Sequence, residues 1–200
     1  MGRPRAFWLD MAVKVALVGL LAFGAFSGLQ QFDGKAFGAR LATYPLALVV
    51  VPIAWWLRGR GRGSPFPYGV DTLLGLPFLI DVLGNAFDLY DTISWWDDLN
   101  HYVNWAILTG AFGLFLLRLR LGHWVIFGLA VGFGATTAIL WEIGEYFAFI
   151  RHSTELSTAY TDTLGDLSLG LFGSATAAVL IVLFASRLDV ENDATAPTEL

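Results

Sequence analysis

The stretch Trp95–Trp105 combines two adjacent carboxylates, a histidine and two asparagines, and tryptophans frame it. If the stretch is helical, Asp97, His101 and Asn104 lie at i, i+4 and i+7 and share one face. A long apolar run, Ala106–Leu117, follows directly. Ionisable residues at the edge of a membrane helix are costly and indicate a functional site. The alternative is an interfacial loop with solvated acids and an aromatic belt.

Two further acidic pairs have helical spacing, Glu142 with Glu145 and Asp162 with Asp166. A simple explanation for Asp162 and Asp166 is that a helix dipole favours carboxylates near an N-terminus. Glu142 and Glu145 fall near the C-terminal end of an apolar segment, where the dipole disfavours them. A functional role is therefore the stronger interpretation for this pair, although Glu145 also has Arg151 as a nearby partner along the chain.

The composition indicates a membrane protein with several spans. The chain has 200 residues, of which 56% are hydrophobic and 14% charged, and its mean hydropathy is +0.62. Soluble domains have about 45–50% apolar and about 25% charged residues. The absence of cysteine excludes disulfides and thiolate sites. No basic patch with interleaved aromatic residues suggests nucleic-acid binding.

The apolar runs predict an all-α bundle of about six membrane-spanning helices. Residues 1–188 form this single domain, and the polar residues 189–200 are expected to be a disordered tail. Lys14, inside the first run, is expected to extend to the near interface. The predicted spans are Met11–Leu29, Leu41–Leu57, Val70–Tyr90, Leu99–Leu117, Trp124–Ile150 and Asp162–Phe184.

The basic residues predict the orientation in the membrane. If the spans alternate, most arginines lie on one side, and the positive-inside rule places that side and both termini in the cytoplasm. We therefore expect a multi-pass protein of the cytoplasmic membrane. These arginines are Arg3, Arg5, Arg58, Arg60, Arg62, Arg118, Arg120 and Arg187.

The same alternation brings acids from four helices to one depth at the outer side, and the sequence suggests nothing comparable at the cytoplasmic ends. Only His101, Arg151 and His152 are apparent cations nearby, so a divalent metal ion is the natural counter-charge. Carboxylate and imidazole ligands suit Mg, Ca or Mn, and also Zn or Fe. The predicted metal ligands are Asp97, His101, Glu142, Asp162 and Asp166, with Glu145 as general base or acid.

Three function hypotheses follow. The first is a metal-dependent site that acts on a lipid or an envelope-linked substrate. The second is a proton- or ion-coupled transporter, in which Asp81, Asn85 and Asp88 line a path as one helical stripe. No inverted repeat is obvious in the sequence, which weighs slightly against transport. The third is a non-catalytic scaffold or accessory subunit whose acids bind a basic loop of a partner protein.

Three sequence blocks resemble those of the YjdF-like (DUF2238) bacterial membrane proteins. More distantly, they resemble VanZ-like proteins, although Gly170 stands where the VanZ-like pattern has Asn. The resemblance implies a polytopic membrane fold and supplies no substrate; VanZ-like proteins are associated with glycopeptide resistance at the cell envelope. The blocks are Asp97-Asp98-Leu99-Asn100-His101, Trp141-Glu142-Ile143-Gly144-Glu145 and Asp162-Thr163-Leu164-Gly165-Asp166-Leu167.

Overall fold

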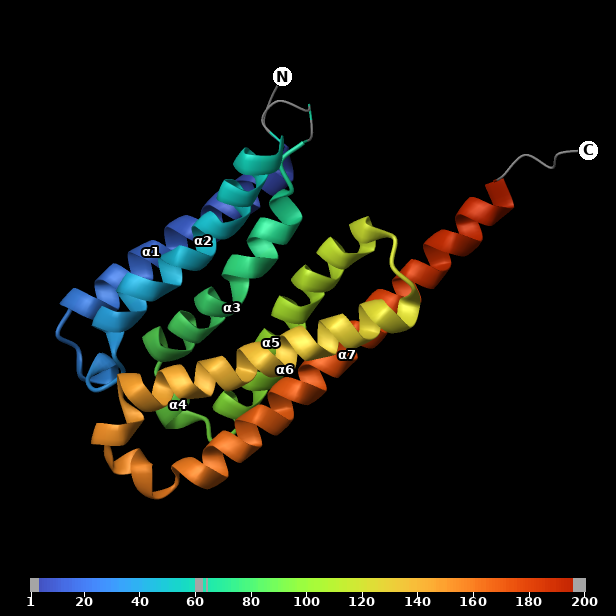
Figure 1. Cartoon of the computed structure of the whole chain (residues 1–200). Coiled ribbons are helices and arrows are strands. Elements are labelled where there is room, and N and C mark those ends of the chain that lie inside the picture. The colour runs from blue at the N-terminus through green and yellow to red at the C-terminus, as the bar shows by residue number, and fades with distance from the viewer. Residues whose placement is uncertain (1–3, 60–62, 64, 196–200) are drawn as a thin grey trace, which may run out of the picture.

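The computed structural model describes residues 4–59, 63 and 65–195, and the regular elements in this part of the chain are all helices (Figure 1). Six of them are long and apolar enough to cross a membrane, which confirms the predicted all-α fold and its six spans. A short helix, α4 (Leu89–Thr92), lies between the third and fourth spans. The long helices are α1 (Arg5–Phe26), α2 (Phe37–Gly59), α3 (Tyr68–Ala86), α5 (Trp96–Leu116), α6 (His123–Ala148) and α7 (Ala159–Thr195).

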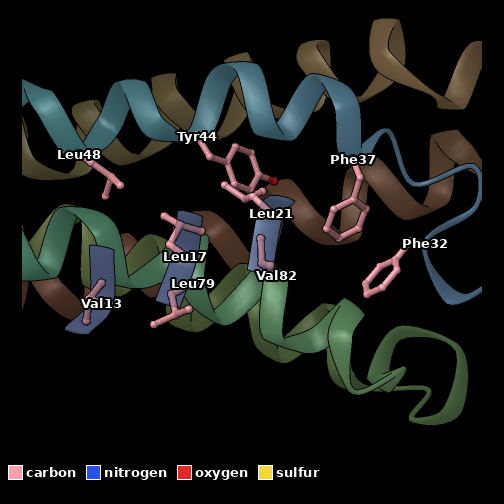
Figure 2. Packing of buried hydrophobic residues seen from close by; sticks show 9 residues of the cluster. All are labelled: Val13, Leu17, Leu21, Phe32, Phe37, Tyr44, Leu48, Leu79 and Val82. Atoms are coloured by element: carbon pink, nitrogen blue, oxygen red, sulfur yellow. The ribbon is translucent and has the colours of Figure 1, made fainter. Parts of the chain in front are cut away.

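The six long helices form two units of three. In the first unit, α1 packs against α2 and α3, and their buried side chains form one hydrophobic cluster (Figure 2). Leu17 and Leu21 of α1 are fully buried in this cluster, as is Val82 of α3. In the second unit, α5 and α6 both pack against α7, with Ala130 and Ala178 completely buried between them. Contacts between α3 and α5 join the two units.

The first helix begins and the last helix ends at the same end of the bundle, as an even number of spans requires (Figure 1). We call this the terminal end. The opposite end, where α1 connects to α2, α3 to α5 and α6 to α7, is the site end. Arg5, Arg58 and Arg187 lie toward the terminal end, as do Arg118 and Arg120 between α5 and α6. Arg3, Arg60 and Arg62, which the orientation argument also used, lie outside the described residues.

Two helix boundaries differ from the predicted ones in ways that change the site. α2 begins at Phe37 rather than Leu41, so Arg40 lies in its first turn and not in a loop. α3 ends at Ala86, and Asp88 adopts a left-handed backbone with φ of 57°. The expectation that Asp81, Asn85 and Asp88 form one helical stripe is therefore wrong, because the helix stops before Asp88.

The last helix is longer than its apolar run. α7 continues to Thr195, so the first part of the segment expected to be a tail is helical in its backbone. The residues 196–200 of that segment lie outside the described part of the chain. Figure 1 shows the C-terminal part of α7 extending beyond the other helices.

Close backbone contact holds α5 and α7 together. A Cβ added at Gly173 of α7 would overlap the backbone carbonyl oxygen of Tyr102 in α5. Thr109 and Ser174, both fully buried, are joined across the same interface by a hydrogen bond of 3.1 Å. Small residues at helix interfaces permit such approach in membranes, where apolar burial gives no separate driving force for association.

Substitution of Gly173 by Ala should therefore destabilise the bundle by about 1–3 kcal/mol, because a backbone carbonyl cannot move aside as a flexible side chain can. Thermal unfolding of the purified protein in detergent measures the effect. Gly128→Ala in α6 is the matched control, since a Cβ there meets nothing within 4 Å and Ala is a better helix former than Gly. Equal unfolding temperatures for the two variants would refute this account of the interface.

Candidate functional site

A cavity of about 550 Å³ lies at the site end of the bundle, between the two three-helix units. Polar side chains from both units line it, and apolar side chains such as Leu108 and Ile150 complete its wall. Its ionisable lining residues are Asp33, Lys35, Arg40, Asp81, Tyr90, Asp91, Asp97, His101, Glu145, Asp162 and Asp166.

His101 is the centre of the acidic part of the site. The helix α5 begins at Trp96, so Asp97 and His101 lie one turn apart on the same face, as the sequence predicts. His101 Nε2 lies 3.6 Å from Asp97 Oδ1 and 3.7 Å from Asp166 Oδ1, which α7 contributes. These distances are too long for hydrogen bonds, so the two carboxylates face one imidazole nitrogen without contacting it directly.

The other imidazole nitrogen faces a carboxylate from α6. His101 Nδ1 lies 3.8 Å from Glu142 Oε1, and the Thr163 hydroxyl donates a hydrogen bond of 3.2 Å to Glu142 Oε2. Glu145, one turn further along α6, lines the cavity. We call Asp97, His101, Glu142, Glu145 and Asp166 the His101 cluster.

Two overlapping groups of donors within this cluster are compact enough to hold a metal ion. Asp97, His101 and Asp166 form one, and His101, Glu142 and Glu145 form the other; in each, the donor atoms lie within 4.8 Å of one another. His101 belongs to both.

Asp162 differs from the other predicted ligands. It lines the cavity but is exposed and belongs to neither compact group. Asp166, one turn deeper in α7, is buried and faces His101 instead. The i, i+4 spacing of the two aspartates predicted that both carboxylates lie on one face of α7. The packing of α7 against α5 brings Asp166, and not Asp162, next to His101.

The sequence interpretation missed the principal cation of the site, Arg40. Its guanidinium forms an ion pair with Asp81 of α3 and donates a hydrogen bond of 2.8 Å to the Tyr44 hydroxyl. The Tyr44 hydroxyl in turn donates to Asp81 Oδ2 at 2.7 Å. The signal that could have found it is the i, i+4 spacing of Arg40 and Tyr44, which continues the predicted span Leu41–Leu57 by one residue toward the N-terminus.

Tyr90 extends this network to the second unit. Its hydroxyl donates a hydrogen bond of 2.8 Å to Asp81 Oδ1 and accepts one from the Asn100 side chain of α5. Burial and then the neighbouring Asp81 carboxylate raise the pKa of the Tyr90 hydroxyl, which keeps it protonated as a donor. We call Arg40, Tyr44, Asp81, Tyr90 and Asn100 the Arg40 network.

Of the three cations expected from the sequence, His101 lies at the centre of the site, whereas His152 is exposed. Arg151 is exposed, and its guanidinium lies 5.3 Å from the centre of the Phe147 ring rather than beside Glu145. Lys35 lines the cavity and forms an ion pair of 2.6 Å with Asp91. The hydrogen bond from Lys35 lowers the pKa of the Asp91 carboxyl, which is therefore ionised at neutral pH.

The expectation that the terminal end carries no comparable polar cluster is wrong. Asp10 and Lys14 of α1 meet Asp71 of α3 there, and both carboxylates are 1% exposed. Lys14 is therefore not simply extended to the interface, because its ammonium lies between two buried acids. Asp10 lies one helical turn from Lys14, and the packing of α1 against α3 brings Asp71 to the same ammonium.

The cavity thus has two chemically distinct walls. The His101 cluster supplies carboxylate and imidazole donors, whereas Arg40 and Lys35 are cations that are each paired with an aspartate. Among the described residues, no ion pair joins a lysine or arginine to the His101 cluster. The donors of the His101 cluster therefore suit a bound cation.

Comparison with known proteins identifies the family. The family model described as "Predicted membrane protein (DUF2238)" matches residues 12–187. No curated protein and no solved structure matches the chain, so the resemblance to VanZ-like proteins stays a prediction. The matched residues include α2, α3, α5 and α6 in full, most of α1 and α7, and every residue of the His101 cluster. The chain therefore belongs to the DUF2238 family of membrane proteins.

Proposed function

We propose that the His101 cluster binds a divalent metal ion and that the cavity acts on an anionic lipid or an envelope-linked substrate. The observation that carries this proposal is the convergence of Asp97, His101 and Asp166 from two helices at the cavity wall. Four carboxylates lie around a single imidazole there. Without a cation, so many acids in an apolar bundle would repel one another and lose hydration.

The donor geometry supports a metal at the Nε2 side of His101. Two ligands that each lie about 2.0–2.2 Å from one ion are separated by roughly 3.0–3.5 Å. The separations of 3.6 Å and 3.7 Å from Nε2 to Asp97 and Asp166 are close to that range. Three protein ligands beside an open cavity are typical of a metal that also binds water or substrate.

Glu142 then has a supporting role rather than the direct one predicted from sequence. Metal-binding histidines commonly donate their second ring N–H to a carboxylate, which fixes the orientation of the ring. Glu142 faces Nδ1 of His101, and Thr163 holds the other oxygen of that carboxylate. Asp162 is exposed and lines the cavity, so we assign it a role in contacting an entering ligand rather than in binding the metal.

The cavity lining supports an amphiphilic substrate with a negative group. Trp105, Leu108 and Trp141 offer apolar surface, and Arg40 lies on the polar part of the wall. A divalent ion at the cluster would polarise a phosphoryl or carbonyl oxygen and lower the pKa of bound water. Glu145 lines the same cavity and is the residue that we assign to accept or deliver a proton.

We also propose that the site end faces outward, with the termini in the cytoplasm. The described arginines of the terminal end, Arg5, Arg58, Arg118, Arg120 and Arg187, support this orientation through the positive-inside rule. In the cytoplasmic membrane, the cavity would then open toward the cell envelope and the outer leaflet.

Ion-coupled transport is the second candidate function. The Arg40 network favours it, because Arg40 and Asp81 form a buried ion pair between two spans. Such intramembrane charges often belong to ion or proton pathways. The path would run along the Arg40 network rather than along the stripe that included Asp88.

Elemental analysis of the purified protein tests the metal site. We expect about one divalent ion per chain, lost in His101→Ala and Asp166→Asn because each removes a direct ligand. Glu142→Gln should weaken binding about 10–100-fold, as expected for a supporting carboxylate. Asp98→Asn is the matched control, since Asp98 adjoins Asp97 but is exposed and outside both ligand groups.

Glu145→Gln separates the two ligand groups. Metal retained in Glu145→Gln and lost in Asp166→Asn assigns the ion to the Asp97–His101–Asp166 group, and the reverse pattern assigns it to the other. A metal content that His101→Ala leaves unchanged would rule out the proposed site altogether, because both groups share this residue.

Cysteine labelling tests the orientation, since the natural chain contains no cysteine. A membrane-impermeant maleimide added to intact cells should label Thr154→Cys at the site end and leave Leu119→Cys at the terminal end unlabelled. Both positions are exposed, so reactivity reports the side of the membrane. Labelling of Leu119→Cys alone would invert the proposed orientation.

Reconstitution into liposomes tests transport. If the second candidate function is correct, a pH gradient should drive proton or cation flux, and Asp81→Asn should abolish it by removing the charge that Arg40 binds. Empty liposomes and the Asp98→Asn protein are the controls. The transport hypothesis fails if the protein-containing liposomes show no more flux than empty ones.

A further inference from the structure

A third buried polar cluster lies at the terminal end of the bundle, opposite the end that carries the His101 cluster and the Arg40 network. Lys14 Nζ is 2.5 Å from Asp71 Oδ2 and 3.1 Å from Asp10 Oδ2. We call Asp10, Lys14 and Asp71 the Lys14 cluster. Asp10 and Asp71 are each 1% exposed, although the helices α1 and α3 that carry them are candidate membrane spans.

The Lys14 cluster has more acid than base. Two carboxylates face one ammonium, and Asp10 Oδ1 and Asp71 Oδ1 have no hydrogen-bond partner among the described residues. Buried polar atoms are nearly always satisfied, so orphaned oxygens need an explanation. The arrangement is that of an oxygen-rich cation site in which the protein's own ammonium is the cation.

The two three-helix units run in opposite directions through the bundle. Helix α1 begins at the terminal end, whereas α5 begins at the site end (Figure 1). In each unit the first helix packs extensively against the third, α1 against α3 and α5 against α7. Every chain with six alternating spans has two halves of opposite direction, and inverted repeats require this relation together with a correspondence of residues.

The polar residues of the two units correspond in sequence. The first helix of each carries an aspartate followed four residues later by a base, Asp10 and Lys14 in α1, Asp97 and His101 in α5. The third helix of each has Asp-Thr-Leu beginning at its fourth residue, at Asp71 in α3 and at Asp162 in α7.

The correspondence has two offsets. Asp10 is the sixth residue of α1, whereas Asp97 is the second residue of α5. His101 faces Asp166, one turn beyond the matching Asp162, whereas Lys14 bonds the matching Asp71 itself. The position in α3 that matches Asp166 is Gly75. A Cβ at Gly75 would lie 3.0 Å from the Leu48 side chain, so the first unit fills this position with apolar packing.

We propose that the chain consists of two inverted three-helix repeats and that the Lys14 cluster is the counterpart of the His101 cluster, a cation site that the Lys14 ammonium occupies. In the first repeat, Asp10 and Asp71 bind the Lys14 ammonium. In the second repeat, the corresponding carboxylate–imidazole site binds an external cation. Each repeat thus places one cation site near the beginning of its first and third helices, at opposite ends of the bundle.

The surroundings of Lys14 fit a permanently filled site. The Phe66 ring centre lies 5.9 Å from Lys14 Nζ, and Phe66 packs against Trp55 and Tyr68. The His101 cluster, in contrast, borders a cavity of about 550 Å³. The two related sites therefore differ in their surroundings, because a cavity borders the one at the site end and an aromatic group lies beside the Lys14 ammonium.

The test is to convert the Lys14 cluster into an external cation site. Lys14→His gives it the Asp–His–Asp donor set of the other cluster, and His101→Ala in the same chain removes the shared ligand of the site end. We expect Lys14→His/His101→Ala to bind about one Zn²⁺ per chain and to gain thermal stability on Zn²⁺ addition. Zn²⁺ is chosen because it accepts carboxylate and imidazole ligands in tetrahedral sites.

His101→Ala alone and Lys14→His/Asp71→Asn/His101→Ala are the matched controls, and both should bind no Zn²⁺ at the Lys14 cluster. A folded Lys14→His/His101→Ala protein that binds no Zn²⁺, or binds it regardless of Asp71→Asn, would overturn the proposal. The outcome is separate from that of the metal proposal above, which concerns the natural chain with His101 intact.

A second pair of variants covers the case in which Lys14→His does not fold. Lys14→Met should lower the unfolding temperature, because it leaves two buried carboxylates without a cation. Lys14→Met/Asp10→Asn/Asp71→Asn should recover most of that loss, because the cluster is then uncharged. If Lys14→Met is as stable as the natural chain, the ammonium is not required by the carboxylates and the proposal is wrong.

Discussion

The cost of placing charge among apolar helices governs the polar architecture of this protein. A carboxylate in such surroundings must meet a cation, a proton or several hydrogen-bond donors. Two of the three buried clusters contain a permanently charged side chain, Arg40 opposite Asp81 and Lys14 between two aspartates. The His101 cluster contains only an imidazole, and this difference makes it the place where an external cation is most strongly favoured.

The two polar groups of the site end depend on each other through the helices that carry them. α5 contributes His101 to the acidic cluster and Asn100 to the Arg40 network, in adjacent positions. Tyr90, in the connection between the two units, bonds both Asp81 and Asn100. The Arg40 network therefore fixes the rotation of α5 relative to α3, and that rotation directs His101 toward α6 and α7.

The function that we propose for this member of the DUF2238 family depends on the cavity between the two units. Its walls combine donors for a hard or borderline cation, a guanidinium and aromatic surface. An amphiphilic molecule with an anionic head group has matching chemistry, and membranes and the cell envelope contain many such molecules. In the proposed repeat arrangement, the His101 cluster beside this cavity has the Lys14 cluster as its counterpart at the opposite end of the bundle.

The sequence by itself determined the six spans and the faces of single helices. Hydropathy and length are local properties, and the i, i+4 spacing of Asp97 and His101 fixes their common face wherever α5 lies. Tertiary structure decided which faces meet: it selected Asp166 over Asp162, brought Arg40 to Asp81 and placed Lys14 between the buried Asp10 and Asp71. Those pairings join residues that are distant in sequence, and they depend on how each helix is rotated and where it begins. Arg40 was missed because α2 begins four residues before the predicted start of the span. Periodicity fixes the direction of a side chain around its own helix, but only packing fixes what lies opposite to it.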